Sequence, residues 1–107
     1  MKHEELMRLV EGFQKEQLSI MESKGTSYSG ATKEVGDRLS NFKRVAAQMG
    51  VTPLQCWLCY VLKHVDSVCT FVRTGHESEG LRSRALDIAN YMILGVALDD
   101  EKKTDAV

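Results

Sequence analysis

Apolar residues recur every three or four positions in four stretches of the chain, which is the spacing of one face of an α-helix. The first stretch covers residues 4 to 22, has most of its charged residues on the other faces, and predicts an amphipathic helix. Residues 23 to 37 hold three glycines and a cluster of hydroxyl side chains without sustained periodicity, and predict a long loop. Loops of this length often bind ligands, although a disordered segment has the same composition.

Capping residues delimit the second and third helices. Asp37 is a candidate N-cap for a short second helix that stops at Gly50. Thr52 and Gln55 have the spacing of a capping box, with a proline at the first helical position between them. The third helix is therefore predicted to start there and to continue to about Arg73.

The fourth helix follows Gly75, which ends the third, and Ser78 is its candidate N-cap. The apolar face of the fourth helix consists of Leu81, Ala85, Ile88, Ala89, Met92, Ile93 and Val96. The polar tail, residues 99–107, is expected to be frayed.

No strand pattern competes with these helices. The sequence therefore predicts a single all-α domain over residues 1–107, arranged as a four-helix bundle with a long loop between its first two helices. The apolar arc of the third helix is wide and few residues remain to cover it, so a homo-oligomer is expected.

Composition excludes several partners. Fourteen Lys and Arg residues against fifteen Asp and Glu residues give a net charge of -1, which supplies no overall field for a nucleic acid or an anionic membrane. No segment reaches the roughly 18 consecutive apolar residues of a membrane span, and the charged, amphipathic start does not resemble a signal peptide. Three cysteines are too few for a disulfide scaffold, so a cytoplasmic location is expected, in the host cytoplasm if the protein is phage-encoded.

Cys56 and Cys59 form a C-x-x-C pair about one turn inside the third predicted helix. Redox pairs of this spacing usually lie at a helix N-terminus in a strand-containing fold, so packing as buried small side chains is the expected role. A zinc site would have to recruit Cys69, His64 or His76.

Four polar residues fall within an arc of roughly 80° on the otherwise apolar fourth helix. They are Glu79, Ser83, Asp87 and Asn90. A carboxylate among apolar neighbours is costly to desolvate unless it is paired or holds a metal ion. Asp87 is therefore expected to pair with Arg82, Arg84 or a lysine, to lie at a solvated margin, or to bind a divalent cation together with Glu79. Oxygen ligands alone would favour Mg²⁺ or Mn²⁺.

Further charged and ionisable residues lie on the third helix and around the loop. Lys63, His64 and Asp66 fit either a solvated face with a partly buried histidine or a surface that faces an anionic ligand. The glycine-rich loop and its surroundings resemble a phosphate-binding segment without a Walker A or Rossmann fingerprint. Their basic residues are Lys24, Lys33, Arg38, Lys43 and Arg44.

Three segments taken together extend over about two thirds of the chain: KGTSYSGATKEVGDRLSNFKRVAAQMGVTP at 24 to 53, YVLKHVDSV at 60 to 68, and SEGLRSRALDIANYMIL at 78 to 94. Their order resembles small phage and prophage proteins related to the MazG-like all-α nucleoside triphosphate pyrophosphohydrolases, including nucleotide modification associated domains. The resemblance implies a helical bundle, usually dimeric or higher, in which acidic side chains hold Mg²⁺ against the phosphates of a nucleotide. By motif, Asp87, Lys63, Lys24 and Tyr28 match residues of that family.

The sequence also departs from the family pattern. Arg84, three residues before Asp87, stands where the family carries the glutamate of a Glu-x-x-Asp pair, and residues 43 to 49 contain no Glu-x-x-Glu pair. Substitute ligands could come from Glu77 and Glu79 or, on the first helix, from Glu16 and Glu22. A protein that binds nucleotides without hydrolysing them fits the same residues.

The predicted function is therefore a protein that acts on or binds nucleotides, with Mg²⁺-dependent pyrophosphohydrolysis as the activity that the resemblance implies. The assigned residues are Glu79 and Asp87 for catalysis and metal binding, and Lys24, Tyr28, Lys63 and Asn90 for nucleotide binding. The alternatives are a non-enzymatic phage accessory protein that binds a host protein or sequesters a signalling nucleotide, and a structural oligomer whose polar stripe joins subunits.

Overall fold

The computed structural model describes residues 1–31 and 35–105, apart from the side chains of residues 25 and 26. It consists of four helices, α1 (His3–Ser29), α2 (Ser40–Met49), α3 (Pro53–Thr74) and α4 (Leu81–Asp105). The described ranges contain no strand, which confirms the predicted all-α class with four helices. No single helix among them has the length and hydropathy of a membrane span, although α2 and α3 together, bent by 101°, meet that criterion.

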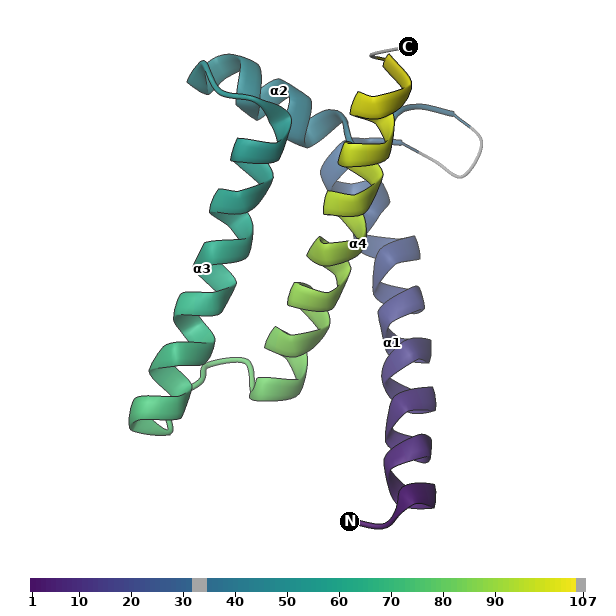
Figure 1. The fold of residues 1–107 in the computed structure, drawn as a ribbon, viewed down its shortest axis with the longest axis vertical. Coiled ribbons are helices and arrows are strands. Elements are labelled where there is room, and N and C mark those ends of the chain that lie inside the picture. Colours follow the sequence, from purple (N-terminus) through teal and green to yellow (C-terminus); the bar gives the residue numbers. More distant parts are fainter. Residues whose placement is uncertain (32–34, 106–107) are drawn as a thin grey trace.

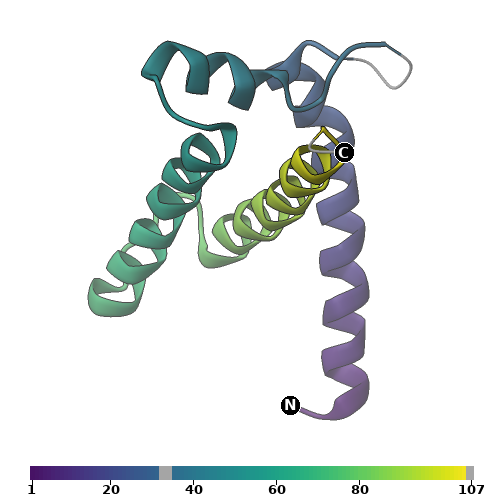
Figure 2. The same ribbon diagram turned by 45° about the horizontal axis from the view of Figure 1, so that its top comes forward.

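The four helices form an open arrangement (Figures 1 and 2). In both views α4 runs between α1 and α3, and α2 crosses the end at which α3 begins and α4 finishes. The radius of gyration is 15.8 Å, compared with about 13 Å for a compact domain of this length. Much of the apolar surface of α1, α3 and α4 therefore remains uncovered.

The core lies where α2 packs against α3 and α4. Its buried members are Leu39, Phe42, Ala46, Cys56 and Leu98. Phe42 is only 2% exposed, and its ring meets the rings of Tyr60 and Tyr91 edge-on, with centroids 5.8 and 6.3 Å apart. Edge-to-face geometry is favourable for aromatic pairs at these separations, so three rings from three helices join this end of the molecule.

Helix α1 is longer than predicted. It continues through residues 23–29, so the expectation of a loop over that stretch is wrong. The helix ends before Gly30, whose φ of 75° lies in the left-handed region that glycine adopts freely. The hydroxyl of Ser40 at the start of α2 donates a 2.9 Å hydrogen bond to the carbonyl of Ser29, which joins the two helices across the connection.

The C-terminal segment is also more ordered than predicted, since α4 runs to Asp105. Lys103 and Asp99 form an ion pair at 2.8 Å with the i,i+4 spacing that supports a helix. The predicted fraying is therefore wrong for residues 99–105, and residues 106 and 107 lie outside the described residues.

Three predicted helix boundaries are confirmed in detail. The amide of Gln55 donates to Thr52 Oγ1 at 3.1 Å, and the amide of Thr52 donates to Gln55 Oε1 at 2.9 Å, which completes the capping box. Gly50 and Gly75 end α2 and α3 in left-handed conformations with φ of 71° and 76°. These signals involve only neighbouring residues, and for that reason sequence alone identifies them.

The predicted N-caps of α2 and α4 are wrong. Leu39 occupies the N-cap position of α2. Asp37 lies two residues earlier, and its Oδ1 accepts a 2.9 Å hydrogen bond from the Leu39 amide. Helix α4 begins at Leu81, three residues after Ser78. In both cases the polar residue belongs to the preceding turn.

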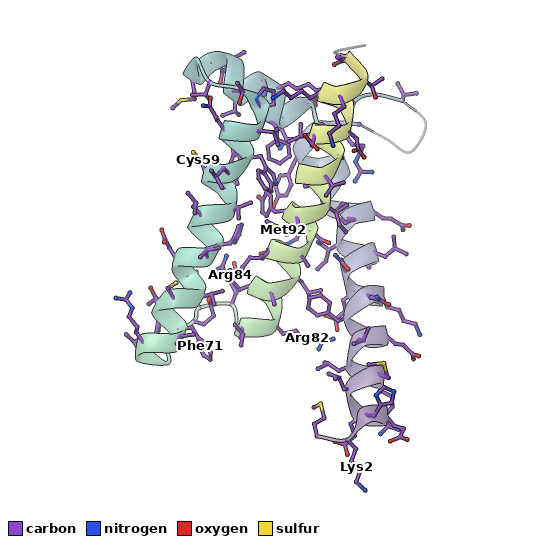
Figure 3. The ribbon with its side chains drawn as sticks, viewed as in Figure 1. Lys2, Cys59, Phe71, Arg82, Arg84 and Met92 are labelled. Atoms are coloured by element: carbon purple, nitrogen blue, oxygen red, sulfur yellow. The ribbon has the colours of Figure 1, made fainter. Side chains whose placement is uncertain are left out.

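The two cysteines of the C-x-x-C pair lie in different environments. Cys56 is buried in the core, as predicted, and burial raises the pKa of its thiol. Cys59 is exposed, so the expectation that both pack in the interior is wrong (Figure 3 labels Cys59 on the outer side of α3). Residues i and i+3 differ by about 60° in the direction that they face on a helix, which is enough to separate them at the edge of an apolar arc.

Helices α3 and α4 approach closely at Gly95. Trp57 on α3 donates an indole N–H to the carbonyl of Tyr91 at 2.6 Å, which places its ring directly over Gly95. A Cβ atom on Gly95 would lie 2.4 Å from Trp57 Cζ2. Glycine is therefore required here for space, in the interior of a helix where it is otherwise unfavourable.

Candidate functional site

A cavity of about 530 Å³ lies between the C-terminal half of α1, the start of α2 and the facing sides of α3 and α4. All six residues assigned to the site from the sequence line it, namely Lys24, Tyr28, Lys63, Glu79, Asp87 and Asn90. Lys24 and Tyr28 lie there because α1 remains helical past residue 22. Glu79 comes from the turn before α4, while Asp87 and Asn90 lie one turn apart on that helix.

Unsatisfied polar groups are concentrated at this cavity. Among the residues that the structure describes, four buried side-chain nitrogen or oxygen atoms have no hydrogen-bond partner: Arg38 Nε, Arg84 Nε, and both amide atoms of Asn90. All three residues line the cavity. Native proteins pair nearly all of their buried polar groups, so a cluster of unpaired ones in a single cavity indicates a place for water or a ligand.

Arg84 organises one wall of the cavity. Its Nη1 donates to His64 Nδ1 at 2.7 Å, and its Nη2 lies 3.3 Å from Glu77 Oε1 and 3.6 Å from Glu79 Oε2. The Glu77 side chain is only 2% exposed and also accepts a 2.8 Å hydrogen bond from the hydroxyl of Ser67. That bond, together with the hydrogen bond from Arg84, lowers the pKa of Glu77, so its carboxylate stays charged.

The arginines do not pair with Asp87. Arg84 bonds to Glu77 and Glu79, and Arg82 bonds to Glu16 on α1 at 2.7 Å. Figure 3 labels Arg84 between α3 and α4 and Arg82 between α4 and α1. Of the three explanations for a carboxylate on this helix, pairing with Arg82 or Arg84 is therefore wrong. In the described part of the chain Asp87 forms no ion pair with a lysine either, and it lines the cavity.

His64 is a neutral member of the same wall. Burial lowers the pKa of its imidazole, the charges of Arg84 and Lys63 lower it further, and Asp87 and Glu79 act in the opposite direction. Because arginine only donates, Nδ1 of His64 accepts and the ring proton lies on Nε2.

Aromatic rings form the adjoining surface. The ring centroids of His64 and Tyr91 are 5.0 Å apart, and Tyr91 stacks on Tyr60 with 10° between the ring planes. Burial raises the pKa of Tyr91, so the phenol is neutral. Of these rings His64 and Tyr91 line the cavity, and Phe42 adds a third ring, so part of the lining is aromatic and weakly polar.

The carboxylates of the cavity are Glu22, Glu79 and Asp87. Within residues 1–31 and 35–105 no group of three or more His, Cys, Asp or Glu side chains converges closely enough to hold a metal ion. Mg²⁺ in nucleotide sites commonly takes only one or two protein carboxylates and completes its shell with phosphates and water. The donor set therefore fits a metal ion that arrives with phosphates. Glu16, the other candidate on α1, is engaged by Arg82.

Sequence reasoning did not assign the aromatic lining residues Phe42 and Tyr91 to the site, and only some of the basic residues that it named around the loop line the cavity. Arg38 lines the cavity and donates to the carbonyl of Met21, which ties α1 to the segment before α2. Lys43 points away and bridges Asp37 and Glu101 at 2.6 and 2.8 Å, while Arg44 is exposed outside the cavity. Lys33 lies outside the described residues. Comparisons with known protein families, with curated proteins and with solved structures found no match.

Proposed function

We propose that this protein binds a nucleotide in the cavity described above. The observation that carries the proposal is the convergence of the four unpaired buried polar atoms of Arg38, Arg84 and Asn90 on one cavity. Guanidinium groups only donate, and they match phosphate oxygens in geometry and charge. Lys24 and Lys63 add two further cations to the lining. A ligand that satisfies these groups is anionic and carries many acceptors.

The aromatic side of the cavity narrows the choice of ligand. His64 and Tyr91 present ring surfaces that a free phosphate would not contact and that a base or sugar would cover, and the buried ring of Phe42 packs edge-on against Tyr91. Cavities of roughly 300 to 1,000 Å³ accept ligands of this size, and about 530 Å³ falls within that range. A nucleoside phosphate combines both chemistries. The resemblance of the sequence to MazG-like proteins leads to the same class of ligand.

Asp87 is the residue that we propose for Mg²⁺-dependent pyrophosphohydrolysis, with Glu79 or Glu22 as the second ligand. A bound Mg²⁺ would neutralise phosphate charge and lower the pKa of a bound water. Asp87 has no ion pair among the described residues and is open to that role, whereas Glu79 is shared with Arg84. This shared carboxylate favours the second candidate function, in which the protein sequesters a nucleotide without hydrolysing it.

Ligand-induced stabilisation tests the proposal. Nucleoside and deoxynucleoside triphosphates at about 100 times their Kd should raise the free energy of unfolding by about 2.7 kcal/mol, measured as a shift in Tm with and without Mg²⁺. Lys63→Ala should weaken binding about tenfold or more because it removes a cation from the cavity wall. Lys15→Ala, which removes an exposed lysine from α1 outside the cavity, is the matched control. If no nucleotide shifts the Tm, the cavity does not serve nucleotides.

Pyrophosphate release separates the two candidate functions in the same samples. If the protein hydrolyses its ligand, Asp87→Asn should abolish Mg²⁺-dependent release while it retains nucleotide binding. Stabilisation by nucleotide without pyrophosphate from the unmodified protein would assign it to sequestration.

We also propose that two copies associate through the outer face of α3 and complete a helical bundle. The chain exposes 7630 Å², about 1,600 Å² more than a compact monomer of its mass. This excess is comparable to what one subunit of an obligate dimer buries. The exposed apolar residues of α3 follow the four-three spacing of a coiled-coil seam. They are Leu58, Leu62, Val65, Cys69 and Val72.

Light scattering tests the association. The unmodified protein should have twice the 12.0 kDa mass of the chain at micromolar concentration, and Leu62→Glu should be monomeric because it places a charge in the centre of the seam. Leu18→Glu changes a leucine that is 62% exposed on α1, away from the seam, and should remain dimeric. A monomeric unmodified protein would refute this association.

A further inference from the structure

The deepest polar group of the cavity is the amide of Asn90. Asn90 is 6% exposed, whereas Lys24, Lys63 and Glu79 on the same lining are exposed. Its neighbours in the lining include Phe42, which is 2% exposed. The cavity therefore has a charged outer part and an inner part where a single amide lies among aromatic and apolar side chains.

Both ends of this amide lack a partner. Oδ1 only accepts and Nδ2 only donates, and neither bonds to another group in the described protein. A phosphate supplies acceptors and leaves Oδ1 unsatisfied. A nucleobase edge offers a donor and an acceptor side by side, which is the pattern that an asparagine side chain meets with two hydrogen bonds. A buried amide that stays unpaired is costly, so the group that fills this end should pair both atoms.

We infer that Asn90 recognises the base of the bound nucleotide, while Lys24, Lys63 and the two arginines face its phosphates. The inference rests on the proposed nucleotide function. It adds that the inner end of the cavity, at Asn90, binds the base of the nucleotide. The ring of Tyr91 and the side chain of Leu94 line the same cavity and would give the base an apolar surface to lie on. Both amide atoms are covered in the free protein, so a neighbouring side chain moves aside as the base enters, as is common at binding sites.

Two ligands that differ only in the base and sugar test the role of Asn90. A nucleoside triphosphate offers both a base edge and phosphates, and inorganic tripolyphosphate offers the phosphates alone. If Asn90 recognises the base, its loss should remove the preference between these two ligands without weakening the phosphate contacts. A residue that only packs would weaken both equally.

Titration calorimetry with Mg²⁺ and with ATP, GTP, CTP, UTP or tripolyphosphate tests this inference. The unmodified protein should bind at least one nucleotide about tenfold or more tightly than tripolyphosphate. Asn90→Leu should abolish that preference and change the tripolyphosphate affinity by less than about threefold. Gln48→Leu, which removes an exposed amide from α2 outside the cavity, should retain the preference.

The outcomes separate the inference from the function on which it rests. A nucleotide preference that persists in Asn90→Leu would overturn the inference, as would equal affinity of the unmodified protein for nucleotide and tripolyphosphate. Absence of binding by every ligand would refute the proposed function itself. Asn90→Ala, measured in parallel, provides the same comparison if Asn90→Leu does not fold by circular dichroism.

Discussion

Alanine at Gly95 is expected to lower the free energy of unfolding by about 2 to 4 kcal/mol, because its methyl group would overlap the indole of Trp57. The added Cβ would lie 2.4 and 2.5 Å from two ring atoms, far inside contact distance. Trp57 cannot retreat without breaking its 2.6 Å hydrogen bond to the carbonyl of Tyr91, so α3 and α4 have to separate. Chemical denaturation followed by circular dichroism measures the loss.

Gly12 provides the matched control because it also lies in the interior of a long helix. The nearest atom to a Cβ at Gly12 is the end of the flexible Arg82 side chain at 3.7 Å, which is ordinary contact. Gly12→Ala should therefore raise the free energy of unfolding by up to about 1 kcal/mol through helix propensity alone. Equal effects at the two glycines would show that Trp57 does not pack against α4 at Gly95.

Local signals explain which parts of the fold were predictable. Thr52 and Gln55 determine the start of α3 through their own side chains, and Gly75 determines its end. The end of α1 was misjudged because Gly25 lowers helix stability by about 1 kcal/mol without stopping a helix. The stop comes at Gly30, where the chain turns towards α2.

The periodicity of the sequence identified the apolar residues of α3. It did not show which of them are covered by other helices of the same chain. Cys56 and Cys59 both belong to a wide apolar arc, yet only Cys56 is buried within the chain. The pattern of apolar positions is the same whether a surface packs internally or against another copy. The sequence indicated that the arc is too wide to be covered fully, but which of its residues stay exposed, Leu62 among them, was beyond what one sequence shows.

The sequence named six residues that line the cavity, but it did not show which side chains contact one another there. Helical spacing placed Asp87 and Asn90 on one face, and motif resemblance added Lys24, Tyr28 and Lys63. The partner of Arg84 could not be inferred, since Glu77 lies in the turn before α4 and its position depends on how that turn folds.

Truncation of Phe42 to alanine is expected to have the largest effect on stability in α2, with a loss of about 3 to 5 kcal/mol. The ring is 2% exposed and contacts both Tyr60 and Tyr91, so its removal leaves a void and two aromatic rings without their partner. Small domains are stable by only about 5 to 15 kcal/mol, so Phe42→Ala should melt far below the unmodified protein in thermal denaturation. Phe42→Leu fills more of the space and should lose less than half as much.

Because Phe42 also lines the cavity, its two variants distinguish the core from the site. Phe42→Leu should remain folded and bind nucleotide more weakly, since it removes part of the aromatic wall, whereas Phe13→Ala should leave binding unchanged. Phe13 is half-buried between α1 and α4, outside this cavity, and lies 5.9 Å from the guanidinium of Arg82. A Phe13→Ala protein as unstable as Phe42→Ala would mean that the contact of α1 with α4 stabilises the fold as much as the core does. In that case the shape of the cavity, which α1 lines on one side, would also depend on how α1 packs against α4.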